Sequence, residues 1–251
     1  MQNQGFMTSA IAAALLAGQA PADTVHIGAM RDNTLFFHAE GAISNGAGQH
    51  FFAGVNSQNN LRRGLLAFDI VGAVPAGATI TGVSLTLHLS SANPAPRMMT
   101  LHRILTAWGE GASDAPGEEG NGAPAQPGDA TWRHTFHDTQ FWTTPGGDFD
   151  AAASGGLLVG DVGFYTWSSV LGNPGMVVDV QQWLDNPALN HGWLLRGDES
   201  TTSTAKRFDT REHPTTEFRP VLTVEYTIPA PATGVLLLAG LVAPRRRRSV
   251  A

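Results

Sequence analysis

The clearest pattern along the chain is a strict alternation of apolar and polar residues over positions 83–90. The apolar members are Val83, Leu85, Leu87 and Leu89. Residues 222–228 repeat the alternation, and shorter apolar runs occur at residues 64–70 and 192–196. A period of two residues is typical of a strand that buries one face. The pattern therefore predicts several β-strands.

One segment has helical spacing instead. Val177, Val180 and Leu184 fall at positions i, i+3 and i+7, which places them on one side of a helix. Asp179 is a candidate for capping the start of this helix, and the Asn-Pro pair that follows ends it. We expect one short helix near residues 177–185.

Residues 109–130 show no apolar period and are rich in Gly, Pro and acidic residues. This composition is typical of a long loop or a disordered insertion, which we expect to extend over residues 109–150. Many short strands, frequent Gly and Pro turns and one short helix predict an all-β fold. The expected architecture is an antiparallel β-sandwich, jelly-roll-like, with this long loop insertion.

The N-terminal residues 1–22 differ from the rest of the chain. An apolar run is followed by small residues and then by Ala20-Pro21-Ala22, the pattern of a signal peptide with its cleavage site. No Lys or Arg precedes the apolar run, so an Ala-rich N-terminus without a signal function is the alternative. We expect export, with a mature domain at residues 23–228.

The C-terminal residues 229–251 form a second separate segment. Pro229 and Pro231 precede a short apolar run, which ends in four arginines. These arginines are Arg245, Arg246, Arg247 and Arg248. An apolar run followed by a basic cluster orients a segment in a membrane, and this run is short for a stable span. The tail therefore predicts a transient membrane-anchored stage on the way to the cell envelope or the extracellular space.

Composition limits the chemistry. The chain has no cysteine, which excludes disulfides, thiol catalysis and thiolate metal sites. It has 15 basic and 21 acidic residues, and loss of the four tail arginines leaves 11 basic residues, a net charge of about −10 with His neutral. Such a domain should not bind nucleic acid non-specifically. It should also be repelled by polyanionic polysaccharides unless a local basic patch or bridging cations intervene.

Several segments together carry a family resemblance. They are Arg-Gly-Leu-Leu-Ala-Phe-Asp-Ile at 63–70 with the turn at 74–80, Val-Asp-Val-Gln-Gln-Trp-Leu at 178–184, Asn-His-Gly-Trp-Leu-Leu at 190–195, and residues 206–212 with 219–226. In order and spacing they resemble the DNRLRE group of extracellular β-sandwich domains, which is related to a carbohydrate-binding module family. The resemblance implies a secreted or surface setting, in which some members bind extracellular polysaccharide.

The tail resembles the PEP-CTERM class of sorting signals, with Pro-Ala-Pro in place of Pro-Glu-Pro. This resemblance implies that the secretion machinery exports the chain. It also implies that a membrane-embedded sorting transpeptidase then cuts near the motif and releases or transfers the protein.

The insertion holds candidate sugar-binding residues. Trp108, Trp132 and Trp142 could offer flat faces to sugar rings, with His134 as a neighbouring polar group. The alternative is a hydrophobic cluster that pins the insertion to the sandwich.

Arg207 and Arg211 form a second candidate ligand site. If residues 206–212 make one strand, both guanidinium groups lie on the same face and suit carboxylate or sugar groups. The alternative is a structural network of salt bridges.

Acidic residues in the Gly-rich loops are candidate metal ligands. Glu110, Asp148 and Asp150 supply hard oxygen donors of the kind that Ca²⁺ prefers, although no EF-hand spacing is present and solvated charge is the alternative. No catalytic motif such as G-x-S-x-G or H-E-x-x-H occurs, so we assign no catalytic residue.

The sequence favours a non-catalytic secreted or surface module, either matrix-structural or polysaccharide-binding. A secreted carbohydrate-active enzyme, hydrolase or lyase, and a Ca²⁺-dependent surface assembly protein remain the alternatives.

Overall fold

The computed structural model describes residues 22–92 and 95–229. Apart from their boundary residues Ala22 and Pro229, the expected signal peptide and sorting tail lie outside the described residues and stay predictions. In the described part, no helix combines the length and the apolar character needed to cross a membrane.

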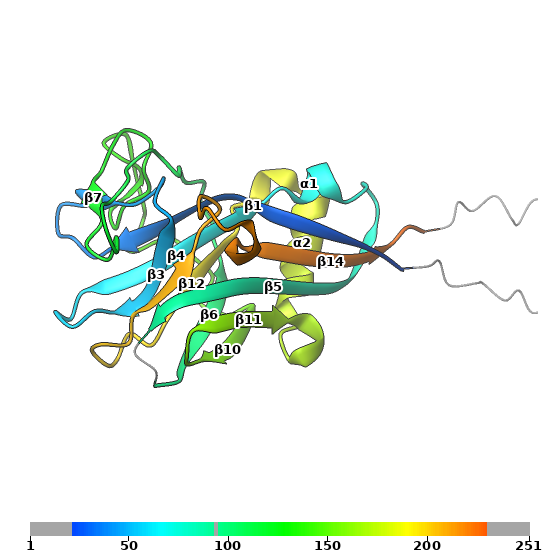
Figure 1. Cartoon of the computed structure of the whole chain (residues 1–251). Helices are drawn as coiled ribbons and strands as arrows, with labels where there is room; N and C mark the ends of the chain where they lie inside the picture. Colours follow the sequence, from blue (N-terminus) through cyan, green and yellow to red (C-terminus); the bar gives the residue numbers. More distant parts are fainter. Residues whose placement is uncertain (1–21, 93–94, 230–251) are drawn as a thin grey trace, which may run out of the picture.

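Strand β1 (Ala22–Phe36) belongs to both sheets of the molecule (Figure 1). Its first half pairs with β14 (Val221–Thr227), and after an irregularity between Ala29 and Arg31 its second half pairs with β4 (Leu61–Phe68). A bulge bends a strand and increases its twist, which allows one strand to leave the first sheet and enter the second.

The two sheets are antiparallel throughout. The first sheet contains the start of β1 with β14, β5 (Thr79–Ala92), β11 (Gly163–Ser168), β13 (Lys206–Asp209) and β3 (His50–Val55). The second contains the rest of β1 with β4, β12 (Trp193–Arg196), β6 (Arg97–Arg103) and β10 (Gly155–Val159).

Because β3 also pairs with β4, six strands close on themselves in the order β1, β14, β5, β13, β3, β4. The predicted all-β, jelly-roll-like antiparallel sandwich is confirmed. The barrel-like closure is a feature that the sequence pattern did not indicate.

The main core lies between the sheets. The alternating apolar residues of β5, which are Val83, Leu85, Leu87 and Leu89, are all buried there, and Leu222 and Val224 of β14 join them. The period-two pattern therefore identified the inward face of two neighbouring strands correctly.

The predicted helix is α2 (Gly175–Asp185), which buries Met176, Val180, Trp183 and Leu184. Asp179 does not cap it, because the helix already begins at Gly175 after Pro174. The buried carboxylate of Asp179 instead accepts hydrogen bonds from the Ser154 hydroxyl and from Trp193 Nε1, the latter at 2.7 Å. Burial raises the pKa of Asp179, and these two hydrogen bonds oppose the rise.

The remaining helices are single turns. They are α1 (Ile70–Ala73), η1 (Ser169–Leu171), η2 (Pro187–Leu189) and η3 (Thr216–Phe218).

The insertion packs on the outer face of the second sheet. Its strand β7 (Ala123–Pro124) pairs with β2 (Ile43–Ser44) from outside the insertion, and within it β8 (His134–Phe136) pairs with β9 (Gln140–Phe141). A second hydrophobic cluster lies beneath it: Leu35, Leu65, Ala67, Ile104, Trp108, Ala130, Trp132, Trp142 and Leu194. Strand β4 is thus buried on both faces, which explains why its sequence is an apolar run and not an alternation.

Candidate functional site

The three tryptophans of the insertion do not form a sugar platform. Trp108, Trp132 and Trp142 are 0%, 7% and 4% exposed. The indole N–H of Trp108 donates to the carbonyl of His191, and that of Trp142 donates to the carbonyl of Thr131, both at 2.8 Å. They belong to a buried hydrophobic cluster between the insertion and the sandwich, as the alternative prediction stated.

His134 is also unsuited to contact a sugar. Only 5% of the residue is exposed, and its Nδ1 lies 2.9 Å from Thr131 Oγ1. Burial lowers its pKa, and the neighbouring His137 lowers it further. The ring of Phe141 in this part of the insertion is exposed, and it packs beside His134 with ring centroids 4.5 Å apart and ring planes tilted by 42°.

The predicted arginine ladder does not form, because β13 ends at Asp209. Arg207 lies on the strand, where its Nε donates to Ser90 Oγ at 3.1 Å and its Nη1 pairs with Glu118. Arg211 lies in the turn that follows. Both arginines take part in ion pairs, as the structural-network alternative predicted.

Asp148 and Asp150 do not join Glu110. Asp148 accepts the backbone N–H groups of Thr143 and Thr144 at 2.8 and 2.9 Å, and Asp150 pairs with Arg103 at 3.2 Å. These contacts fix the end of the insertion, so the three predicted metal ligands are not gathered at one point.

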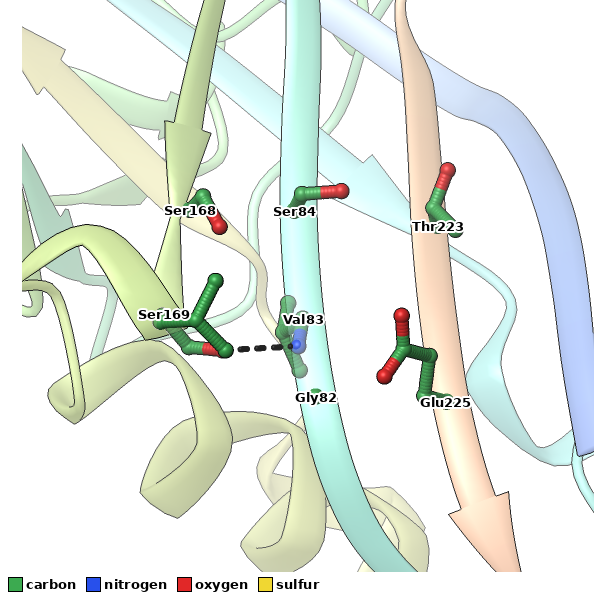
Figure 2. Close-up of a pocket in the computed structure, with 8 residues that line it drawn as sticks. Gly82, Val83, Ser84, Ser168, Ser169, Thr223 and Glu225 are labelled. Carbon is green, nitrogen blue, oxygen red and sulfur yellow. Dashed lines mark hydrogen bonds between the residues drawn. The ribbon is translucent and has the colours of Figure 1, made fainter. Parts of the chain in front are cut away.

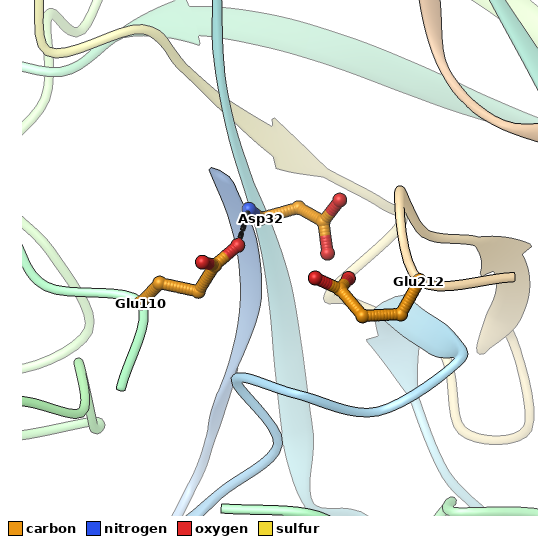
Figure 3. A group of neighbouring side chains, drawn as sticks. All are labelled: Asp32, Glu110 and Glu212. Atoms are coloured by element: carbon orange, nitrogen blue, oxygen red, sulfur yellow. Dashed lines mark hydrogen bonds between the residues drawn. The ribbon is translucent and has the colours of Figure 1, made fainter. Parts of the chain in front are cut away.

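Glu110 meets two other carboxylates instead, from Asp32 on β1 and Glu212 in the turn after β13 (Figure 3). One oxygen from each lies within 4.8 Å of the others. We call this group the carboxylate triad. No metal-binding role for Glu212 or Asp32 was predicted from the sequence. The one signal for Asp32 is that it is an acidic residue within a strand, where a buried acid is rare unless it has a partner.

Arg211 is the main cation at the triad. Its Nε and Nη2 donate to the two oxygens of Glu110 at 2.7 and 2.6 Å, and Nη2 also lies 2.8 Å from Glu212 Oε1. These hydrogen bonds with Glu110 raise the pKa of Arg211.

Burial raises the pKa values of two members of the triad. Burial raises the pKa of Asp32 well above its usual range, the charge of Glu212 adds to this, and a backbone hydrogen bond from Arg211 opposes it. Burial also raises the pKa of Glu212. Raised carboxyl pKa values occur at catalytic sites, but Asp32 has no exposed surface for a substrate to reach.

A second polar cluster lies on the other side of the same turn. Fully buried Asp209 accepts hydrogen bonds from Nδ1 of His50 at 2.8 Å and Nδ1 of His88 at 2.6 Å, and His213 Nε2 lies 3.9 Å away. Burial alone would raise the pKa of Asp209, but the histidine hydrogen bonds outweigh it and lower the pKa. The cluster ties β13 to β3 and β5.

The surface has hollows of very different sizes. The one between β5, β14 and the end of β11, bordered by Ser84, Ser169 and Glu225, has a volume of only about 30 Å³ (Figure 2). A hollow of this volume has room for about one water molecule and is too small for a sugar.

A hollow of about 340 Å³ lies on the second sheet, which we call the β6–β12 hollow. Its lining residues are Pro96, Arg97, Met98, Thr100, Arg196, Gly197 and Asp198. Arg196 lies directly opposite Thr100 in the register of β12 and β6. The insertion does not line this hollow, so it is an open part of the sheet's outer face.

Carboxylates hold both arginines of the β6–β12 hollow in place. Arg97 pairs with Asp198 at 3.3 Å, and Arg196 pairs with Glu199 at 2.8 Å, yet the two arginine side chains are 34% and 41% exposed. Glu199 also accepts two hydrogen bonds from Arg63, at 2.6 and 3.0 Å. The guanidinium groups are therefore both positioned and accessible.

A scan against protein-family models finds no match for this chain, and no curated protein matches its sequence.

Proposed function

We propose that the protein is a non-catalytic β-sandwich module of the DNRLRE kind that binds an extracellular, neutral polysaccharide in the β6–β12 hollow. The observation that carries this proposal is the pair of accessible arginines, each held by a carboxylate, along one open hollow of about 340 Å³.

The chemistry of the hollow suits sugar hydroxyl groups. A guanidinium group offers several N–H donors in a planar fork, and the neighbouring Asp198 offers acceptor oxygens. Met98, which is 49% exposed, adds an apolar surface for the C–H face of a sugar ring. Asp198 and Glu199 offset most of the positive charge of Arg97 and Arg196, and the net charge of about −10 on residues 23–228 repels polyanions. These features favour a neutral glycan.

The setting of the proposal comes from the two ends of the chain. The signal peptide at residues 1–22 sends the chain out of the cytoplasm, and the PEP-CTERM-like tail holds it briefly in the membrane until a sorting transpeptidase cuts it. The module then acts in the envelope or the extracellular matrix.

Glycan arrays and calorimetry with the purified full chain test the proposal. We expect binding of a neutral polysaccharide that Arg97→Ala weakens by about tenfold or more, because a hydrogen bond to a charged group contributes about 1.5–3 kcal/mol. Arg133→Ala is the matched control, since Arg133 lies in the insertion and donates to the carbonyl of Ala39.

Absence of neutral-glycan binding, or equal binding by the two variants, would contradict the assignment of the hollow. Release of reducing ends or unsaturated products, abolished by one carboxylate substitution, would establish the enzyme alternative instead.

A further inference from the structure

We infer that the carboxylate triad of Asp32, Glu110 and Glu212 binds a calcium ion. This site is separate from the β6–β12 hollow and does not depend on the proposed function. The inference rests on oxygen atoms without partners, on the charge at the triad and on the spacing of its oxygens.

Two buried oxygens of the triad lack partners. Asp32 is 0% exposed, and its Oδ1 has no hydrogen-bond partner within the described residues. The same holds for Oε2 of Glu212. Figure 3 shows these two carboxyl groups facing each other. A buried acceptor without a partner costs the free energy of its lost hydration, so both oxygens point to a positively charged ligand between them.

Protein cations do not neutralise the triad. Arg211 supplies one positive charge, since its Nε and Nη2 donate to Glu110 and its Nη2 also lies 2.8 Å from Glu212 Oε1. Arg31 lies nearby and its charge interacts with Glu110, although its guanidinium group stacks on Trp108 at 4.6 Å and donates to the Trp108 carbonyl. Two cations against three carboxylates leave negative charge at the triad.

The donor atoms and their spacing favour calcium. All three ligands are carboxylate oxygens, which suit hard cations and not zinc or copper. Oxygens bound to one Ca²⁺ at about 2.4 Å lie at most about 4.8 Å apart, and the oxygens of the triad lie within that distance of one another. One hard cation can therefore contact all three carboxylates. Mg²⁺ dehydrates reluctantly and is seldom held by protein carboxylates alone, so calcium suits this donor set better.

The ion would join three distant parts of the chain. Asp32 belongs to β1, Glu110 to the start of the insertion and Glu212 to the turn after β13. The insertion is already attached here, because Glu110 accepts the Asp32 backbone N–H at 2.8 Å and Asn33 Nδ2 donates to the Glu110 carbonyl at 2.7 Å. Calcium would strengthen this attachment.

The test uses the full chain, freed of metal with a chelator and then dialysed. Calorimetric titration with CaCl₂ should show one site with a Kd of about 10⁻⁴ M, the range of extracellular calcium modules. At about 10 mM CaCl₂ the Tm should rise by about 5 °C, and MgCl₂ should have a smaller effect.

Glu212→Gln should weaken calcium binding at least tenfold and abolish the Tm shift. The matched control is Glu225→Gln, which changes an exposed glutamate on β14 away from the triad (Figure 2) and should leave both unchanged. If Glu212→Gln does not fold, the wild-type chain can be titrated with terbium instead. Terbium luminescence that CaCl₂ abolishes would then show that calcium binds.

The inference fails if the wild-type chain shows no calcium heat, no displacement of terbium and the same Tm with and without chelator. In that case Asp32 and Glu212 share a proton, and Asp32→Asn should raise the Tm in the absence of any metal because it removes a like-charge contact. Equal calcium binding by Glu212→Gln and Glu225→Gln would likewise overturn it.

Discussion

Glu199 shows how two arginines can fix one carboxylate beside the β6–β12 hollow. It receives Arg63 from β4 and Arg196 from β12, and its side chain is only 10% exposed. Burial alone would raise the pKa of Glu199, but the hydrogen bonds and charges of the two arginines outweigh burial and lower the pKa. Its ionised form therefore stabilises the folded state.

This stabilisation should depend on pH in a defined direction. A glutamate whose pKa is lowered by folding contributes fully above its unfolded pKa of about 4.3, and the contribution is lost as the pH falls through the lowered value. We expect Glu199→Gln to reduce the free energy of unfolding by about 2 kcal/mol at pH 7 and to differ little from the wild type near pH 2.

Urea denaturation of both proteins over this pH range measures the difference. The control is Glu217→Gln, which changes an exposed glutamate and should have almost no effect at any pH. A Glu199→Gln difference that stays constant from pH 7 to pH 2 would show that the carboxylate charge does not stabilise the fold.

For the secondary-structure elements, the sequence patterns predicted the strands and the helix but not the packing of the insertion. Strand β5 and helix α2 bury residues at regular intervals, so their periods are visible in the sequence. The insertion buries tryptophans that are spaced irregularly, because loops place side chains without a period. For the same reason the exposure of Trp108, Trp132 and Trp142 could not be decided from the sequence.

We expect the packing of the second hydrophobic cluster to hold the insertion against the sheet. Trp142→Ala removes a buried indole and should cost about 3–5 kcal/mol, with loss of order confined largely to residues 109–150. Hydrogen exchange and limited proteolysis should then report increased opening and new cleavage within the insertion.

The neighbouring residue provides the control for this experiment. Phe141 is 60% exposed, so Phe141→Ala should leave the cleavage pattern and the stability nearly unchanged. Equal protection of the insertion in the two variants would show that the tryptophan cluster does not hold it.

The carboxylate triad marks a further limit of prediction from sequence. Glu110 is a predicted metal ligand, but Asp148 and Asp150, which were predicted with it, lie elsewhere. Its neighbours in space come from β1 and from the turn after β13. Residues 78 and 102 positions away along the chain are brought together by the paths of the two sheets. Residues so far apart in the sequence follow no spacing rule that would reveal such a group.

The charge of the whole molecule predicts how it responds to salt. Residues 23–228 carry a net charge of about −10, so a polyuronate or DNA should be repelled at low ionic strength. Salt screens repulsion, and any weak association with a polyanion should therefore increase as salt is added. A basic nucleic-acid-binding protein shows the opposite dependence. Retention on immobilised polyuronate at about 0.02 and 0.3 M NaCl, without divalent cations, distinguishes the two. Tighter retention at low salt would contradict the prediction.

The position of β14 affects how the molecule can fold. The last strand of the domain lies between β1, the first strand, and β5, and Ala22 is paired with Thr227. Folding that depends on pairing between distant parts of a chain is slow, because a long loop must close before those contacts form. The ring of strands therefore cannot close before residues 221–227 are available to pair with β1 and β5, and a chain that stops before residue 221 lacks the strand that completes it.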